Sequence, residues 1–251
     1  MSFLQKSNHS DHHIKHHHIE NNGPKDLSST ITYQRDSPLE FIIYFARFFF
    51  LGWIELPLYF FSTGKIFYGL IFFLCETLSL TLFATAFAYS SNKLGVFLVF
   101  GLPFILIRFG MMSGNWGQHA FVDPTNPEND FRSSISCVQT VYNAICFNDG
   151  YHTSHHLNSI RHWQDHPEHM VQNQQKYRDQ KAIIFKNIDF HGIWCCLMIK
   201  DYETMARSFV QLTSEGEPGH KSHDEIVAFL KSRTRRMTRE EIKKAYTLVK
   251  K

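Results

Sequence analysis

Hydrophobic and polar residues are strongly segregated along this chain of 251 residues. Sixteen of the 24 phenylalanines fall within residues 41–109, whereas 13 of the 16 histidines fall in two flanking blocks, residues 9–18 and 119–169. Helices that are buried on one side and exposed on the other would mix the two classes every three or four residues. The segregation therefore predicts a membrane-embedded middle with a histidine-rich segment on either side.

The middle contains three apolar stretches, residues 39–61, 67–89 and 94–112. Each has about the 20 residues that a membrane-spanning helix requires. The second carries one charge, Glu76, and the third only Arg108, near its end, where a long side chain can snorkel to the interface. A polar turn at residues 91–93 joins these two stretches, which predicts a transmembrane hairpin. Because they lack a polar face, buried helices of a soluble core are disfavoured.

The first stretch differs, because it contains Glu40, Arg47 and Glu55 and is interrupted by Pro57. A charge at the bilayer centre costs about 2.5 to 3.5 kcal/mol on insertion scales, but little in the interface plane. An odd number of crossings would also place the two histidine blocks on opposite sides of the membrane. We therefore predict an interfacial or re-entrant helix followed by two crossings.

Composition narrows the function classes and sets the orientation. The net charge is only +3, and no stripe of Lys and Arg is interleaved with aromatic residues, so nucleic-acid binding is not expected. The five cysteines include no C-x-x-C and predict free thiols. The N-terminal segment lacks the apolar run of a signal peptide. The basic tail from Lys221 onward is expected in the cytosol, and an even number of crossings then places both termini there.

These patterns predict an all-α fold, an integral membrane helical protein with a transmembrane hairpin and a cytosolic histidine-rich helical cap. Two capping boxes, Ser222-x-x-Glu225 and Thr238-x-x-Glu241, predict two short helices in the tail. We expect four segments: a His-rich cytosolic segment (residues 1–38), a membrane region (39–112), a cytosolic histidine region (113–181) and a helical tail (182–251).

The histidines have the spacing of metal ligands. Imidazoles bind Fe, Zn, Cu and Ni, and side chains three or four residues apart lie on one face of a helix. Two triplets and one isolated residue give seven candidates: His13, His17, His18, His119, His152, His155 and His156. One zinc ion needs only four ligands, so seven favour a dinuclear site. The N-terminal run by itself is equally compatible with a low-complexity tract.

Three other residues are secondary candidates. Asn115 and Asp149 either orient ligand rings or cap helices. His162, four residues before His166, is an additional candidate ligand or part of a solvated loop. A soluble metal-dependent hydrolase is disfavoured, since no glutamate stands inside an H-E-x-x-H motif. Transport is disfavoured because the histidines lie outside the apolar stretches.

Taken in order, these motifs resemble the membrane fatty acid desaturase and alkane hydroxylase superfamily. His13-x-x-x-His17-His18, followed by Pro24-x-Asp26-x-Ser28, is similar to the middle histidine box of that superfamily. Asn115-x-x-Gln118-His119 is similar to its isolated-histidine motif, although Gln118 stands where alkane hydroxylases usually carry Glu. His152-x-x-His155-His156 resembles its last box.

The resemblance implies a non-haem di-iron centre that uses O2 to desaturate or hydroxylate an acyl or alkyl lipid chain at the cytosolic membrane face. It implies that the seven histidines bind the two iron ions. It also implies a separate electron donor, of the cytochrome b5 or ferredoxin type, and a location in the endoplasmic reticulum membrane.

The sequence departs from the superfamily in one respect. Members carry an earlier box, usually H-x-x-x-H, well before the middle one, and only twelve residues precede His13. Two interpretations stay open. The chain is either a truncated form of an enzyme or a short, catalytically degenerate paralogue that acts as a non-catalytic membrane scaffold or metal-binding protein.

Overall fold

A computed structural model describes residues 12–214 and 216–248, and these are mostly helical, as predicted. The first eleven residues of the expected His-rich segment and the last three of the expected tail lie outside the described residues. In chain order the elements are η1 (His13–His17), α2 (His18–Glu20), α3 (Pro38–Ser62), α4 (Ile66–Tyr89), α5 (Lys93–Val96), η2 (Phe97–Gly101), α6 (Leu102–Gln118), α7 (Asp130–Ser133), β1 (Ile135–Val138), α8 (Val141–Ile145), α9 (His152–Leu157), η3 (Trp163–Asp165), α10 (His166–Gln172), α11 (Gln174–Asp179), β2 (Ile183–Lys186), α12 (Phe190–Ile199), α13 (Tyr202–Ser208), α14 (His223–Arg233) and α15 (Arg239–Leu248).

The chain divides into two compact units. Unit 1 comprises Met1–Asn21, Lys25–Ser28 and Ile42–Met112, and unit 2 comprises Asn22–Pro24, Ser29–Phe41 and Ser113–Lys251. The N-terminal histidine block (residues 9–18) thus belongs to unit 1, and the later block (residues 119–169) belongs to unit 2. The four-segment organisation expected from the sequence stays a prediction.

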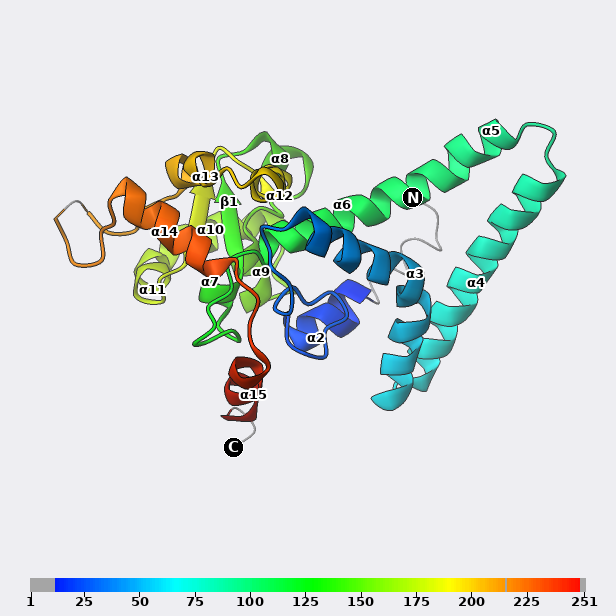
Figure 1. Cartoon of the computed structure of the whole chain (residues 1–251), viewed down its shortest axis with the longest axis horizontal. Coiled ribbons are helices and arrows are strands. Elements are labelled where there is room, and N and C mark those ends of the chain that lie inside the picture. The colour runs from blue at the N-terminus through cyan, green and yellow to red at the C-terminus, as the bar shows by residue number, and fades with distance from the viewer. Residues whose placement is uncertain (1–11, 215, 249–251) are drawn as a thin grey trace. The chain divides into compact units, whose positions relative to one another are not determined.

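Unit 1 contains most of the apolar sequence. Within residues 12–214 and 216–248, three helices are long and apolar enough to cross a membrane: α3, α4 and the Lys93–Gln118 segment formed by α5, η2 and α6. α4 contacts α5 and η2, so the predicted hairpin is confirmed, and Figure 1 shows its two arms. At the polar turn, the Asn92 side chain accepts a hydrogen bond from the Gly95 N–H at 2.8 Å and caps α5. The interfacial placement of α3 stays a prediction, since α3 is itself long enough to span.

One detail expected of these helices is wrong, and one contact was not expected. α3 is not interrupted at Pro57 but continues through it, because an apolar helix can accommodate the loss of one backbone N–H donor. Arg108 donates a hydrogen bond to Glu76 of α4, a pairing that the sequence did not predict, and its placement at the membrane interface stays a prediction. A paired charge is less costly in apolar surroundings than a separate one.

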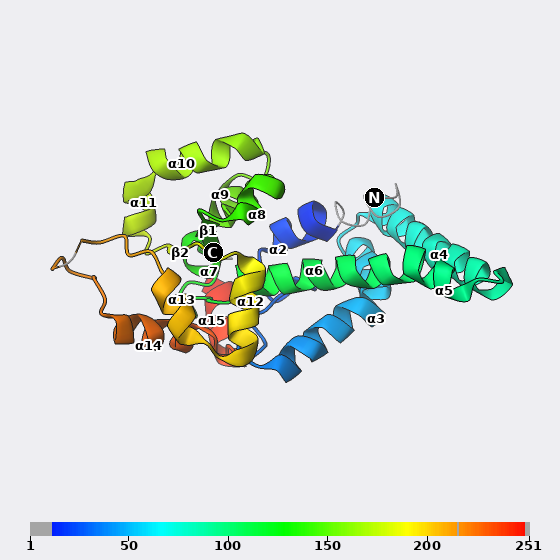
Figure 2. The same ribbon diagram turned by 90° about the horizontal axis from the view of Figure 1, so that it is seen from above.

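Unit 2 contains a two-stranded parallel sheet that the sequence pattern did not predict (Figure 2). β1 pairs with β2 in a register that places Ile135 opposite Ile183. α9 packs against β1 and α13 packs against β2, while Ile184 joins a core cluster with Phe131 and Tyr177. Both strands are only four residues long, and the first three residues of each are buried, so they lack the alternation that identifies a half-exposed strand.

The C-terminal helices confirm both capping boxes. The Ser222 hydroxyl accepts a hydrogen bond from the Glu225 N–H, and the Glu225 carboxylate accepts one from the Ser222 N–H at 2.7 Å. Thr238 and Glu241 repeat this exchange at 3.1 and 2.8 Å. All five cysteines are free, as predicted.

One buried side chain, Arg35, ties distant parts of unit 2 together. Each of its five N–H groups donates to a backbone carbonyl, at distances of 2.5 to 3.1 Å. The acceptors are Thr30, Tyr33, Ala120, Arg233 and Arg235. Arg35 therefore joins the residues before α3, the loop after α6 and the end of α14.

Replacing Arg35 by methionine is expected to destabilise unit 2 strongly. Each buried acceptor that loses its donor costs about 1 to 3 kcal/mol, so a total above about 3 kcal/mol is expected. A lower midpoint of thermal unfolding in detergent would measure this loss. Arg236→Met is the matched control, because Arg236 pairs with Glu40 at the surface, where an ion pair contributes at most about 1 kcal/mol. Equal midpoints for the two variants would contradict the assignment.

Candidate metal-binding histidines and an apolar cavity

The N-terminal histidines of unit 1 lie on a π-helical turn. The His18 N–H donates to the His13 carbonyl, five residues earlier. A π-helix has about 4.4 residues per turn, so residues four and five apart share a face. The rings of His13 and His17 stack with centroids 5.7 Å apart, and Nε2 of His13 lies 3.2 Å from Nε2 of His18. The turn therefore brings the three predicted ligands of this box together.

Asp26 fixes the orientation of the His17 ring. Its Oδ2 lies 2.6 Å from His17 Nδ1, and its Oδ1 accepts hydrogen bonds from the N–H and hydroxyl of Ser28 at 2.8 and 2.7 Å. Burial by itself would raise the pKa of Asp26, but the His17 ring and its hydrogen bond hold that pKa well below its usual range. An ionised carboxylate only accepts hydrogen bonds, so Nδ1 carries a proton and Nε2 is the ring nitrogen left to bind a metal.

His16 has a different role from its neighbours. Its Nε2 accepts a hydrogen bond from the Leu27 N–H at 2.9 Å, and its ring packs edge-on against Tyr59. Burial lowers the pKa of His16, which favours the neutral ring that this hydrogen bond requires. His16 therefore supports the local fold, whereas His13, His17 and His18 form the ring cluster.

Three histidines converge in unit 2. His119 directly follows α6, and His152 and His156 lie one turn apart on α9. Nε2 of His152 is 3.3 Å from Nε2 of His119 and 3.0 Å from Nε2 of His156. Each of the three rings offers a ligand atom within 4.8 Å of the other two. The fold thus brings the isolated histidine next to two of the three histidines of the last box.

Oxygen acceptors behind two of these rings set their orientation. His119 Nδ1 donates to the Ser133 carbonyl at 3.1 Å, and His156 Nδ1 lies 3.7 Å from Oδ1 of Asp130. Both rings therefore present Nε2 to the cluster, and outer acceptors of this kind are typical of metal-binding histidines. Neither residue was predicted from the sequence, because tertiary packing creates both contacts. One indication of Asp26 was present in the sequence, namely its place in the Pro24-x-Asp26-x-Ser28 pattern that follows the box of His13, His17 and His18.

A close approach to β1 fixes the start of α9. The Gly150 carbonyl accepts a hydrogen bond from the Cys137 N–H at 2.7 Å, and the Asn143 amide binds the backbone of both residues at 2.9 Å. A Cβ atom on Gly150 would lie 2.1 Å from Asn143 Oδ1 and 2.3 Å from the Cys137 carbonyl oxygen. Only glycine fits there, so β1 positions His152, two residues further on.

These donor sets fit a transition-metal ion. Imidazole nitrogens bound to one ion at about 2.1 Å lie about 3.0 to 3.4 Å apart for bond angles between octahedral and tetrahedral. Three Nε2 separations, His13–His18 in unit 1 and His119–His152 and His152–His156 in unit 2, are 3.0 to 3.3 Å and fall in this range. Imidazole suits Fe, Zn, Cu and Ni, whereas Mg and Ca prefer oxygen ligands. The histidine clusters are therefore candidate metal sites.

The remaining candidates stay predictions as site residues. The His155 ring on α9 lies 6.0 Å, centroid to centroid, from those of His152 and His166. The Asn115 carbonyl accepts the hydrogen bond of the His119 N–H. His162 is exposed, and its ring accepts a hydrogen bond from the Gln164 N–H at the start of η3, which matches the solvated-loop alternative.

Asp149 is half-buried and contacts the side chain of Gln118. It accepts hydrogen bonds from the Gln118 amide at 3.3 Å and the Tyr142 hydroxyl at 3.1 Å. Burial raises the pKa of Asp149, while the Tyr142 hydrogen bond opposes the shift. Asp149 thus acts on the residue next to His119 in sequence, and its role in a metal site stays a prediction.

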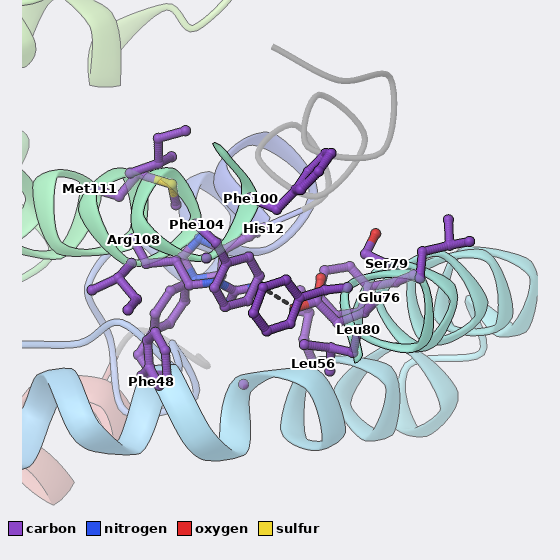
Figure 3. A pocket seen from close by; sticks show the side chains of 18 of the residues that line it. His12, Phe48, Leu56, Glu76, Ser79, Leu80, Phe100, Phe104, Arg108 and Met111 are labelled. Atoms are coloured by element: carbon purple, nitrogen blue, oxygen red, sulfur yellow. Dashed lines mark hydrogen bonds and ion pairs between the residues drawn. The ribbon is translucent and has the colours of Figure 1, made fainter. Parts of the chain in front are cut away.

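Unit 1 also contains a cavity of about 670 Å³ among α3, α4, η2 and α6 (Figure 3). Its walls are mainly aromatic and aliphatic, with His12 of the first histidine block at one side. Arg108 and Glu76 form a polar spot in the wall. Ligand pockets usually measure about 300 to 1,000 Å³. The cavity therefore has the size and chemistry to hold a hydrocarbon chain.

Comparison with known proteins identifies one family. The sequence profile of the family described as fatty acid desaturase matches residues 1–187. No curated protein and no solved structure matches the chain. The matched region contains the apolar helices, both strands and all seven histidines predicted as ligands.

Asp26→Asn is expected to weaken metal binding while leaving the fold intact. An amide can donate as well as accept, so it no longer fixes the proton on His17 Nδ1, and loss of such an acceptor lowers metal affinity by about 10- to 100-fold. Zn²⁺ titration of metal-free protein against a competing chelator measures this change. Asp201→Asn, at the N-cap of α13, is the control. Equal affinities for both variants would refute the orienting role of Asp26.

Proposed function

Because the chain belongs to the fatty acid desaturase family, we propose that it is a membrane oxidoreductase that desaturates or hydroxylates an acyl or alkyl lipid chain, using O2 and two histidine-bound iron ions. The profile match over residues 1–187 supports the reaction class. The three long apolar helices support a membrane location.

The common orientation of the ring nitrogens is the observation that carries this proposal. Within each unit, predicted ligands meet through Nε2 atoms, and oxygen acceptors stand behind His17, His119 and His156. We infer that the ligands of the two ions are His13, His17, His18, His119, His152, His155 and His156. Asn115 and Asp149 would support ligand rings, and His162 is an additional candidate.

Each part of the chain has a definable task in such a reaction. Bound iron supplies the O2 activation and the hydrogen removal from an unactivated C–H bond that side chains alone cannot perform. The histidines would hold the metal as neutral rings, and Asp26 and the Ser133 carbonyl keep the Nδ1 protons of His17 and His119 away from it. The apolar cavity excludes water and keeps a hydrocarbon chain extended along the helices.

Two further features of the proposal come from the family. Electrons come from a separate donor of the cytochrome b5 or ferredoxin type, which docks on the side that bears the histidines. The protein lies in the endoplasmic reticulum membrane with both termini in the cytosol, an orientation that the basic residues of the tail favour.

Iron content and the effect of His152→Ala test the proposal. Anaerobic reconstitution of detergent-purified protein should give about two irons per chain, and His152→Ala should abolish turnover of the lipid substrate, because its ring contacts both partners of the unit 2 cluster. His223→Ala, an exposed histidine of α14, is the control. Fewer than one iron per chain, or unchanged activity in His152→Ala, would favour a non-catalytic scaffold or metal-binding protein instead.

A further inference from the structure

Unit 2 exposes a group of large apolar side chains outside the candidate membrane helices. Val141 and Ile145 lie four residues apart on α8 and are 80% and 71% exposed, and Phe147, just after α8, is 68% exposed. The rings of Phe147 and Trp163 meet edge to face with centroids 5.5 Å apart, and Trp163, at the start of η3, is 38% exposed. We call these four residues the apolar patch. Single exposed apolar residues are normal, whereas a group of them marks an interaction site.

The backbone holds Phe147 in its exposed position against its own preference. Phe147 has a φ of 51° and Asn148 a φ of 54°, in the left-handed region that bulky residues rarely adopt. The Asn148 N–H donates to the Asn143 carbonyl at 3.0 Å, and the Asn148 side-chain amide donates to the Trp163 carbonyl at 3.1 Å. Such a conformation persists only where the surrounding structure enforces it, and it commonly marks a functional site. The fold therefore fixes an aromatic ring on the surface.

The surroundings of the apolar patch carry little charge. Residues 141–148 contain no charged side chain. Arg161 is turned into unit 2, because its Nη1 donates to the carbonyl and the hydroxyl of Ser154 at 2.7 and 2.6 Å. Asp165, in the same short helix as Trp163, is the N-cap of α10 and adds one exposed carboxylate. Protein partners are commonly selected by complementary charge, whereas aromatic residues in neutral surroundings gather at the membrane–water interface. The chemistry of the patch therefore fits a lipid surface without net charge.

Side-chain contacts attach α8 to the end of a candidate membrane span. α6 ends at Gln118, whose amide donates to Asp149 at 3.3 Å, and Asp149 accepts a second hydrogen bond from the Tyr142 hydroxyl of α8 at 3.1 Å. The Tyr142 ring packs edge-on against His191 of α12, with centroids 5.9 Å apart, and His191 Nδ1 lies 3.2 Å from the Ser113 hydroxyl of α6. Two routes therefore join α8 to the last part of α6.

The last part of α6 is where that span leaves the membrane. The Lys93–Gln118 segment has 26 residues. A helix of that length extends about 39 Å, whereas the hydrocarbon core of a bilayer is about 30 Å thick. Its apolar stretch ends at residue 112, so the residues that follow reach the headgroup region. The contacts of α8 with these residues favour a position of the apolar patch at the same level, where Trp and Phe side chains partition well.

We propose that the apolar patch inserts into the boundary between headgroups and acyl chains of the membrane that contains the long helices, so that unit 2 rests on the lipid surface. The inference goes beyond the proposed reaction, since the contact requires neither metal nor turnover. It also gives the constrained Phe147 a task, because a side chain that is already fixed in place loses less conformational entropy when it is buried in lipid.

Quenching of Trp163 fluorescence tests the lipid contact. The full chain, free of metal, is reconstituted into phosphatidylcholine vesicles with or without bromine on the acyl chains near the headgroup. The signal of Trp163 is the difference between the wild type and Trp163→Phe, which keeps an aromatic ring in the patch. We expect brominated lipid to remove most of this signal, because bromine quenches an indole ring that touches it. Trp53 of α3, measured in the same way with Trp53→Phe, is the positive reference.

A Trp163 signal that survives in brominated lipid would overturn the proposal, and acrylamide in the aqueous phase would then identify the true surroundings. Quenching by acrylamide would show that the patch lies in water. Resistance to both quenchers would show that protein covers it, either a second copy of the chain or another partner.

Phe147→Asp tests the patch by a second route. A carboxylate is costly to bury at the lipid boundary, so bromine quenching of Trp163 should fall in this variant. Asp adopts the left-handed backbone more readily than Phe, so the midpoint of thermal unfolding in detergent should not decrease. Val171→Asp, at an exposed position of α10 outside the patch, is the matched control. Equal quenching in the two variants counts against the proposal. Ile145→Asp carries the same expectation if Phe147→Asp does not fold.

The two proposals fail separately, because the quenching is measured without metal. Iron binding and turnover in a protein whose Trp163 is not quenched by brominated lipid would overturn the lipid contact alone. Quenching of Trp163 in a protein that binds no iron would overturn the proposed reaction and leave the lipid contact intact.

Discussion

Unit 2 depends on the buried guanidinium of Arg35, all of whose N–H donors are hydrogen-bonded. A guanidinium removed from water is tolerated only when its donors are satisfied, and Arg35 achieves this with five backbone carbonyls from segments that have little regular structure of their own. One acceptor is the carbonyl of Ala120, and the Thr30 hydroxyl donates to the carbonyl of His119 at 2.8 Å. The junction that stabilises the fold therefore also holds the backbone of a candidate ligand.

Hydrogen-bond partners also distinguish side chains that support the fold from side chains that are able to bind a ligand elsewhere in the chain. His16 uses its acceptor nitrogen on a backbone N–H, whereas His17 and His119 use Nδ1 on an oxygen and present Nε2. Arg35 uses all five of its donors on backbone carbonyls, whereas Arg108, among the residues that the structure describes, donates to Glu76 at the wall of a mainly apolar cavity. In each comparison the residue type is the same, and the partners that the fold supplies determine what the side chain can do.

Much of this organisation could be predicted from the sequence, because it arises from local patterns. The hairpin follows from two apolar stretches around a polar turn, α14 and α15 follow from their capping boxes, and the family follows from the order of three histidine motifs. Contacts between residues far apart in the sequence could not be predicted from local patterns. The short buried strands β1 and β2 have no alternation, the five acceptors of Arg35 come from remote segments, and Asp130 reaches His156 only through the fold. The pairing of Arg108 with Glu76 also requires knowledge of how two helices face each other.

The π-helical turn that carries His13, His17 and His18 has a consequence for comparing related sequences. Its histidine pair begins four residues after His13, whereas the pair of the last box begins three residues after His152. A π-helix has more residues per turn than an α-helix. In a π-helix the residues four and five after the first histidine lie on either side of that histidine one turn later, and in an α-helix the residues three and four after it do so. A one-residue gap in an alignment across such a box would then record a change of helical pitch, with every imidazole conserved in place.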